Sequence, residues 1–118
     1  MLTATANRLD VMNRVGRAMA DPSRSRILLA LLAGPSYPAA LAESLQLTRQ
    51  NVSNHLGCLR DCGIVTATSE GRQARYEIAD PHLASALSTL VDVVLAVDAS
   101  APCQDACCAV DGCGQQPA

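Results

Sequence analysis

The chain has 118 residues, of which 49% are apolar and 17% are charged, and its net charge is −2. A chain of this length forms one small domain with a thin core, which leaves little room for the deep cleft of an enzyme. It contains no Trp or Phe, and its aromatic residues are Tyr37 and Tyr76. Binding of nucleic acid by stacking bases on aromatic side chains is therefore not expected.

The charges are distributed unevenly along the chain. All nine basic residues are Arg and lie within residues 1–79, beside six acidic residues, whereas residues 80–118 hold five acidic residues and no base. Apolar runs such as residues 93–97 are far too short to span a membrane, and the N-terminus lacks a secretory pattern. We therefore expect a cytoplasmic protein with a basic front, an acidic rear and no membrane partner.

Hydrophobic spacing and cap residues predict four helices in the first half of the chain. We expect them over residues 8–19, 22–33, 38–45 and 49–62. Asp21 and Thr48 are the expected N-caps of the second and fourth helices. The third and fourth helices are short, closely connected, and the fourth begins in polar residues, which is the pattern of a helix-turn-helix.

The second half predicts a hairpin and a last helix. Two short strands, Ile64 to Thr68 and Ala74 to Ile78, surround a turn, and a hairpin directly after a helix-turn-helix is a wing. A last helix starts after the N-cap Asp80 and is expected to run to about Asp98. Its apolar residues spread around more than one face, so we expect it to pack against a second copy of itself.

The expected fold class is therefore mainly α with a small β-hairpin, in the form of a winged helix-turn-helix. We expect residues 1–98 to form the DNA-binding and dimerisation domain and residues 99–118 to form a flexible, cysteine-rich, metal-binding tail.

The fourth helix presents short polar groups once its apolar stripe faces inward. Gln and Asn can pair with adenine edges, Ser accepts or donates, Gly permits close approach, and nearby Arg side chains meet phosphates. The candidate contacts to double-stranded operator DNA are Arg49, Gln50, Ser53, Asn54, Gly57, Arg60, Arg72 and Arg75. A merely solvated helix face is the alternative, which the adjoining wing disfavours. His55 lies between the two faces and is interpreted as a histidine at the border of the core.

Cys58 and Cys62 are four residues apart on the fourth helix, so their sulfurs project from adjacent turns of one face. Two helical thiols cannot complete a metal coordination shell, so further ligands must come from another segment or subunit. The tail offers Cys103, Cys107, Cys108 and Cys113. Thiolate ligands favour Cd²⁺, Pb²⁺, Hg²⁺, As(III) or Cu(I), and Zn²⁺ stays a candidate. A pair of small, half-buried apolar residues is the alternative to a site.

Three segments carry a specific pattern, namely residues 17–27 (RAMADPSRSRI), 47–63 (LTRQNVSNHLGCLRDCG) and 70–76 (EGRQARY). They resemble the ArsR/SmtB family of winged-helix metal-sensing repressors, and specifically its CmtR-like cadmium/lead branch. The middle segment is the most specific, because a cysteine pair on the recognition helix itself separates this branch from the others.

The resemblance implies that Cys58 and Cys62 bind Cd(II) or Pb(II) together with Cys103 of the other protomer. It also implies a homodimer built from the first and last helices, which binds its operator when metal-free and releases it when metal binds. The remaining tail thiols have no counterpart, and they can replace Cys103, add a fourth sulfur or form a second site. These residues are Cys107, Cys108 and Cys113.

The sequence departs from other branches of this family. Residues 38–47 lack the Cys-x-Cys of an arsenite site, although As(III) can still use the tail thiols. Asp80 and His82 look like half of a zinc site, but Val93 and Ala96 stand where its other two ligands would be. We therefore interpret Asp80 as a helix cap and His82 as a residue of the first turn.

Three other functions remain open at the level of sequence. A redox-sensing repressor of the same fold would close a disulfide in place of binding metal, and an As(III)-responsive repressor would use the tail cysteines. A metal-buffering protein would use its helix-turn-helix for packing alone. An enzyme is the least supported class, because the chain shows no Ser/His/Asp set, phosphate loop or carboxylate pair.

Overall fold

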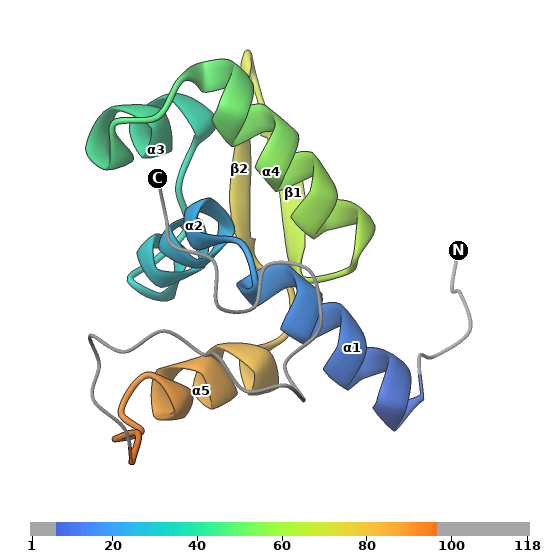
Figure 1. Ribbon diagram of the computed structural model, residues 1–118. Coiled ribbons are helices and arrows are strands. Elements are labelled where there is room, and N and C mark those ends of the chain that lie inside the picture. Colours follow the sequence, from blue (N-terminus) through green and yellow to red (C-terminus); the bar gives the residue numbers. More distant parts are fainter. Residues whose placement is uncertain (1–6, 97–118) are drawn as a thin grey trace.

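The computed structural model describes residues 7–96, which form five helices and a two-stranded sheet (Figure 1). The elements follow the order α1 (Arg8–Met19), α2 (Pro22–Leu32), α3 (Pro38–Leu45), α4 (Arg49–Asp61), β1 (Val65–Glu70), β2 (Gln73–Ile78) and α5 (Pro81–Leu90). The pair α3–α4 is the predicted helix-turn-helix, and the β1–β2 hairpin beside it is the predicted wing. The winged helix-turn-helix fold is therefore confirmed.

Side-chain caps begin four of the helices. Asn7, Asp21, Thr48 and Asp80 each accept a hydrogen bond from a backbone N–H in the first turn of the following helix. Such a bond satisfies one of the N–H groups that have no partner within the helix. Between α3 and α4, Gln46 takes the left-handed conformation (φ 57°, ψ 45°), which ends α3 and redirects the chain into the cap of α4.

The core lies between α2, α3, α4 and the hairpin. Its fully buried members are aliphatic, namely Ile27, Leu41, Val52, Leu56, Leu59 and Val65. Burying a side chain of this size contributes about 1.5–3 kcal/mol. Three of the six come from α4 at the predicted spacing, so the opposite face of α4 is fixed toward solvent.

The hairpin is longer and tighter than the sequence predicted. Its antiparallel ladder runs from Val65 opposite Ile78 to Glu70 opposite Gln73, so the strands extend past the predicted ends at the turn. The turn consists of two residues, the first of which is Gly71 with φ 63°. A glycine at the first position of a two-residue turn matches the right-handed twist of the strands, which lets the ladder continue to the turn.

The second strand also pairs with the connection between α2 and α3. Ser36 and Tyr76 exchange two backbone hydrogen bonds of 3.0 and 2.8 Å, and the Tyr76 side chain is buried. No pattern in the sequence indicates this contact. It attaches the base of the wing to the chain segment that leads into α3.

Helix α5 ends at Leu90, which corrects the expectation of a helix to about Asp98. Leu87 is buried and Leu83 packs against the edge of the core, whereas residues 91–96 are all exposed. The exposed segment contains three Val residues and one Asp, which are poor helix formers. Packing does not offset this low propensity, so the helix ends within one turn of its last buried residue, Leu87. No helix within residues 7–96 has the length and apolarity that crossing a membrane requires.

Candidate DNA-binding surface and thiol site

The solvent face of α4 carries the short polar side chains that the sequence predicted. Gln50, Ser53 and Asn54 are exposed, and Gln50 Nε2 donates a hydrogen bond to Asn54 Oδ1 at 3.1 Å. Gly57 is half-buried on the same helix, and a Cβ added there would meet no atom within 4 Å. Internal packing therefore does not require this glycine, and a ligand surface can approach the backbone closely at this point.

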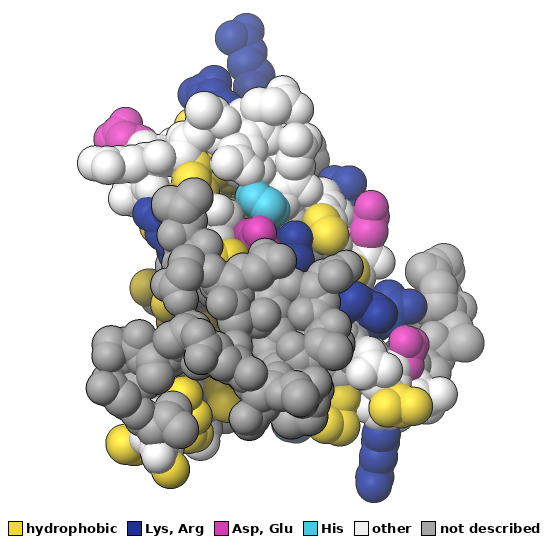
Figure 2. All heavy atoms as spheres, in the orientation of Figure 1, with side chains coloured by type: hydrophobic (Ala, Val, Ile, Leu, Met, Phe, Trp, Pro, Cys, Tyr) yellow, Lys and Arg dark blue, Asp and Glu magenta, His cyan; other side chains and the backbone are white. Residues whose placement is uncertain are grey.

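Exposed arginines flank this face. Arg49 opens α4, Arg60 lies in its last turn and Arg72 lies in the turn of the wing. Figure 2 shows basic side chains (dark blue) at the top of the view, where the hairpin tip and the start of α4 lie in Figure 1. Among the described residues Arg72 has no ion-pair partner, so its full charge is available to a phosphate.

Arg75 differs from the other candidate arginines because two carboxylates hold it. Its Nη1 lies 3.3 Å from Glu77 Oε2, its Nε lies 4.0 Å from Glu70 Oε2, and its side chain is 35% exposed. The Tyr37 hydroxyl donates to Glu70 Oε1 at 2.8 Å, and this hydrogen bond raises the pKa of Tyr37 above its ordinary value. These contacts fasten the wing to the start of α3 and leave Arg75 with less free charge than Arg72.

The two cysteines of the described chain lie one turn apart at the carboxyl end of α4. Cys58 is exposed, whereas Cys62 is half-buried against the edge of the core and caps the helix. The Cys62 N–H donates to the Cys58 carbonyl at 3.0 Å, which continues the helical ladder across the pair. Neither thiol forms a disulfide within residues 7–96. Two soft donors on neighbouring turns, one exposed and one half-buried, can supply two ligands to a thiophilic cation.

The pair does not form a complete metal site within the described residues. Across residues 7–96 no group of three or more His, Cys, Asp or Glu side chains lies close enough to hold an ion. This agrees with the argument that two helical thiols need further ligands. The tail cysteines, Cys103, Cys107, Cys108 and Cys113, lie outside the described residues, so the full ligand set stays a prediction.

Asp80 and His82 serve the start of α5, as interpreted from the sequence. Asp80 Oδ1 accepts a hydrogen bond of 2.7 Å from the His82 backbone N–H and lies 3.0 Å from its ring Nδ1. The backbone hydrogen bond, together with the contact to the ring, holds the pKa of Asp80 below its ordinary value. Both side chains are exposed.

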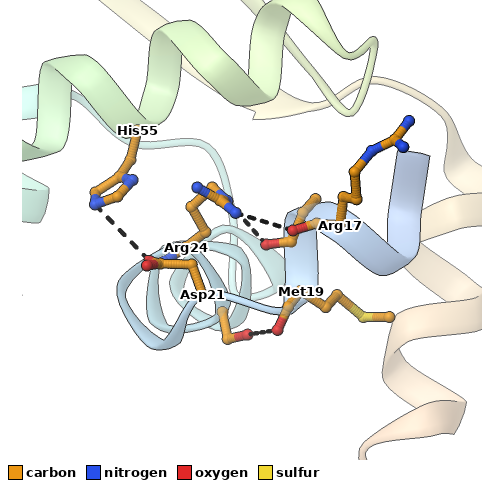
Figure 3. Close-up of polar contacts among 7 residues, drawn as sticks. Arg17, Met19, Asp21, Arg24 and His55 are labelled. Carbon is orange, nitrogen blue, oxygen red and sulfur yellow. Dashed lines mark hydrogen bonds and ion pairs between the residues drawn. The ribbon is translucent and has the colours of Figure 1, made fainter. Parts of the chain in front are cut away.

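His55 connects α4 to the junction of α1 and α2 (Figure 3). Its Nε2 lies 3.8 Å from Asp21 Oδ2, and its side chain is 19% exposed, which confirms its predicted place at the border of the core. The same carboxylate oxygen caps α2 by accepting from the Arg24 N–H at 3.0 Å. The Arg24 guanidinium donates to the carbonyls of Arg17 and Ala18 at the end of α1. No spacing in the sequence indicated these contacts, because they join separate helices.

Comparison with known proteins supports the assignment of the fold and identifies the family. The model of the family described as "Bacterial regulatory protein, arsR family" matches residues 21–67. The chain is 64% identical over 96 residues to the HTH-type transcriptional regulator CmtR of Mycobacterium tuberculosis, covering 81% of both chains. It is 36% identical over 107 residues to a probable mercury resistance operon repressor of Streptomyces lividans, covering 91% of this chain and 83% of that one.

Solved structures agree with these relatives. The NMR structure of the cadmium metal-sensor CmtR from Mycobacterium tuberculosis superposes with a TM-score of 0.63, covering 80% of this chain and 98% of that chain. The homodimeric winged helix-turn-helix domain Mb0332 of Mycobacterium bovis, 31% identical, superposes with a TM-score of 0.64 and covers 77% of this chain and 90% of that chain. By its fold, its helix-turn-helix and its 64% identity with CmtR, the chain belongs to the arsR family of bacterial regulatory proteins.

Proposed function

We propose that the chain is a cytoplasmic, metal-responsive transcriptional repressor. Its metal-free homodimer binds operator DNA, and it dissociates when Cys58, Cys62 and Cys103 bind Cd(II) or Pb(II) as the effector. One observation carries this proposal: free thiols, one of them exposed, lie on the helix that presents the base-reading side chains. The relative CmtR, described as a cadmium metal-sensor, supports the choice of metal.

The thiols and the base-reading side chains lie close enough on α4 for binding at one to affect the other. Gln50, Asn54 and Cys58 follow one another at intervals of four residues, so they form one row along the helix. An ion held at Cys58 therefore lies about one turn from an amide that reads bases. Capture of a metal by thiolates releases protons, so effector affinity rises with pH.

A tail ligand would convert capture into release of DNA. Holding the tail of one subunit to α4 of the other changes the spacing of the two α4 helices or brings acidic residues toward the DNA. Either change weakens operator binding, because both half-sites must be met together and phosphates repel carboxylates. Couplings of this kind are worth about 1–3 kcal/mol, or roughly 5- to 150-fold in affinity.

Exposed apolar side chains support a homodimer through the first and last helices. Leu9 and Met12 on α1 are 68% and 72% exposed, and Leu90 and Val91 at the end of α5 are 47% and 54% exposed. Large apolar side chains left exposed on the first and last helices of a small domain are typical of an interaction surface. A self-complementary contact of this kind is the commonest arrangement in soluble oligomers and supplies two DNA-reading helices.

Substitution of the helix thiols tests the proposal. Cys58→Ser and Cys62→Ser are expected to bind operator DNA as the wild type does and to stay bound when Cd²⁺ is added. The measurement is a gel shift on a duplex that the metal-free protein selects from a random-sequence pool. Operator binding without metal is the control within each variant. If both variants still leave the duplex on adding Cd²⁺, the thiol pair is not the sensing site.

A further inference from the structure

Arg14, on α1, reaches the end of α4 that carries Cys62. Its Nη1 donates to the Cys62 carbonyl oxygen at 3.5 Å, and its Nε donates to Asp10 Oδ2 at 3.2 Å. The hydrogen bond to Cys62 joins α1 to the carboxyl end of α4. The contact with Asp10 is an i,i+4 ion pair that holds the guanidinium in place.

The chemistry of a helix end explains why a cation lies there. The last carbonyls of an α-helix have no partner within the helix and carry the negative end of its dipole. Arg14 supplies a charged donor to one of them from a different helix. The backbone position of Cys62 and the position of α1 are therefore linked by a charge-assisted contact.

Helix α1 also carries exposed apolar side chains that we expect to contact the partner subunit. Leu9, Val11 and Met12 share α1 with Arg14 and are 68%, 47% and 72% exposed. Because α1 is a continuous helix of 12 residues, a shift imposed through Arg14 moves these apolar side chains with it. Within one subunit, α1 thus connects a thiol-bearing turn to the proposed dimer contact.

We propose that Arg14 is a positioning residue that transmits metal capture at Cys62 to α1, and through α1 to the placement of the two α4 helices. This inference rests on the proposed function, because it requires that Cys62 binds the effector and that the dimer reads the operator. Arg14 is not among the residues proposed to bind the metal or to read bases. Its removal is therefore expected to separate metal binding from release of DNA.

The experiment compares Arg14→Gln with the wild type and with Arg8→Gln. Arg8 is an exposed arginine of the same helix that makes no side-chain hydrogen bond or ion pair among the described residues, so its variant matches the charge change. Sulfur-to-metal charge-transfer absorbance gives the stoichiometry of Cd²⁺ binding. Fluorescence anisotropy on the selected duplex gives operator affinity with and without Cd²⁺.

We expect Arg14→Gln to bind the wild-type number of Cd²⁺ ions and to keep metal-free operator affinity within about threefold. Its ratio of metal-free to Cd²⁺-loaded affinity falls to near 1, from a wild-type ratio in the range of roughly 5 to 150. Arg8→Gln keeps the wild-type ratio. Arg14→Lys retains the positive charge but not the planar guanidinium, so it is expected to keep part of the wild-type ratio.

Two results overturn the role of Arg14. The first is that Arg14→Gln keeps the wild-type ratio of metal-free to Cd²⁺-loaded operator affinity. The second is that this variant loses the Cd²⁺ absorbance, because Arg14 would then be needed to form the metal site itself. If Arg14→Gln does not fold, Asp10→Asn replaces it, because it releases the guanidinium without removing it and predicts the same fall. A wild-type protein that keeps its operator affinity in Cd²⁺ refutes the proposed function itself.

Discussion

The imidazole of His55, on α4, lies 3.8 Å from the carboxylate of Asp21, which caps α2 (Figure 3). Asp21 thus serves two helices at once. Through Arg24 the same junction includes the last carbonyls of α1. Replacement of the Asp21 carboxylate is therefore expected to change how α4, α2 and α1 pack against one another.

We expect Asp21→Ala to destabilise the protein by about 1 kcal/mol or slightly more, because it removes the cap of α2 and the partner of His55. Asp21→Asn keeps a good capping side chain and loses only the charge, so it is expected to cost less. Urea denaturation followed by circular dichroism measures both. Thr48→Ala, which removes the cap of α4 alone, is the matched control. Equal midpoints for Asp21→Ala and wild type would contradict the double role.

The two wing arginines are expected to contribute unequally to DNA binding. Arg72→Ala lowers operator affinity at all salt concentrations and reduces the slope of log affinity against log salt by about 1, as loss of one phosphate contact predicts. Arg75→Ala has a smaller effect, because Glu77 and Glu70 already offset its charge. Anisotropy titrations over a series of salt concentrations measure the slopes. A larger slope change for Arg75→Ala would reverse this assignment.

The tail ligand can be identified by comparing Cys103→Ser with a chain truncated after Cys103. If Cys103 is the third ligand, the truncated chain keeps the charge-transfer band of the wild type and Cys103→Ser loses intensity. Titrations with Cd²⁺, Pb²⁺, Zn²⁺ and As(III) rank the effectors on the same samples. The opposite pattern, loss on truncation alone, assigns the role to Cys107, Cys108 or Cys113.

The start of α5 predicts a pH dependence. Because the His82 backbone N–H holds the pKa of Asp80 below its ordinary value of 3.8, the folded state binds this proton less tightly than the unfolded state. The stabilisation is therefore present above about pH 4 and is lost as pH falls through the folded-state pKa. NMR titration of the Asp80 carboxyl carbon measures that value directly. A titration midpoint above 3.8 would contradict the capping role.

The exposed face of α1 is expected to control assembly. Met12→Glu places a charge on an apolar side chain that is 72% exposed, and we expect it to weaken the dimer and, with it, operator binding. Asn13→Glu introduces the same charge at an exposed polar neighbour and serves as the control. Sedimentation velocity gives the oligomeric state. Unchanged sedimentation of Met12→Glu would exclude this face from the interface.

Sequence reasoning succeeded where the signal is local. The caps Asp21 and Thr48, the buried stripe of α4 and the polar face opposite it all follow from residue type and helical period. The extent of α5 was overestimated, because hydrophobic spacing does not show where packing ends. Contacts such as Arg14 with Cys62 join residues far apart in the chain, and no periodicity predicts them.

The double hydrogen bond between Ser36 and Tyr76 has a mechanical consequence. It attaches the wing to the segment that leads into α3. We therefore expect the hairpin and the helix-turn-helix to move together as one unit. Binding of an effector to such a subunit is then expected to change the position of the wing relative to the helix-turn-helix very little. Under the proposed function, the response to the effector is therefore expected as a reorientation of one whole subunit against its partner.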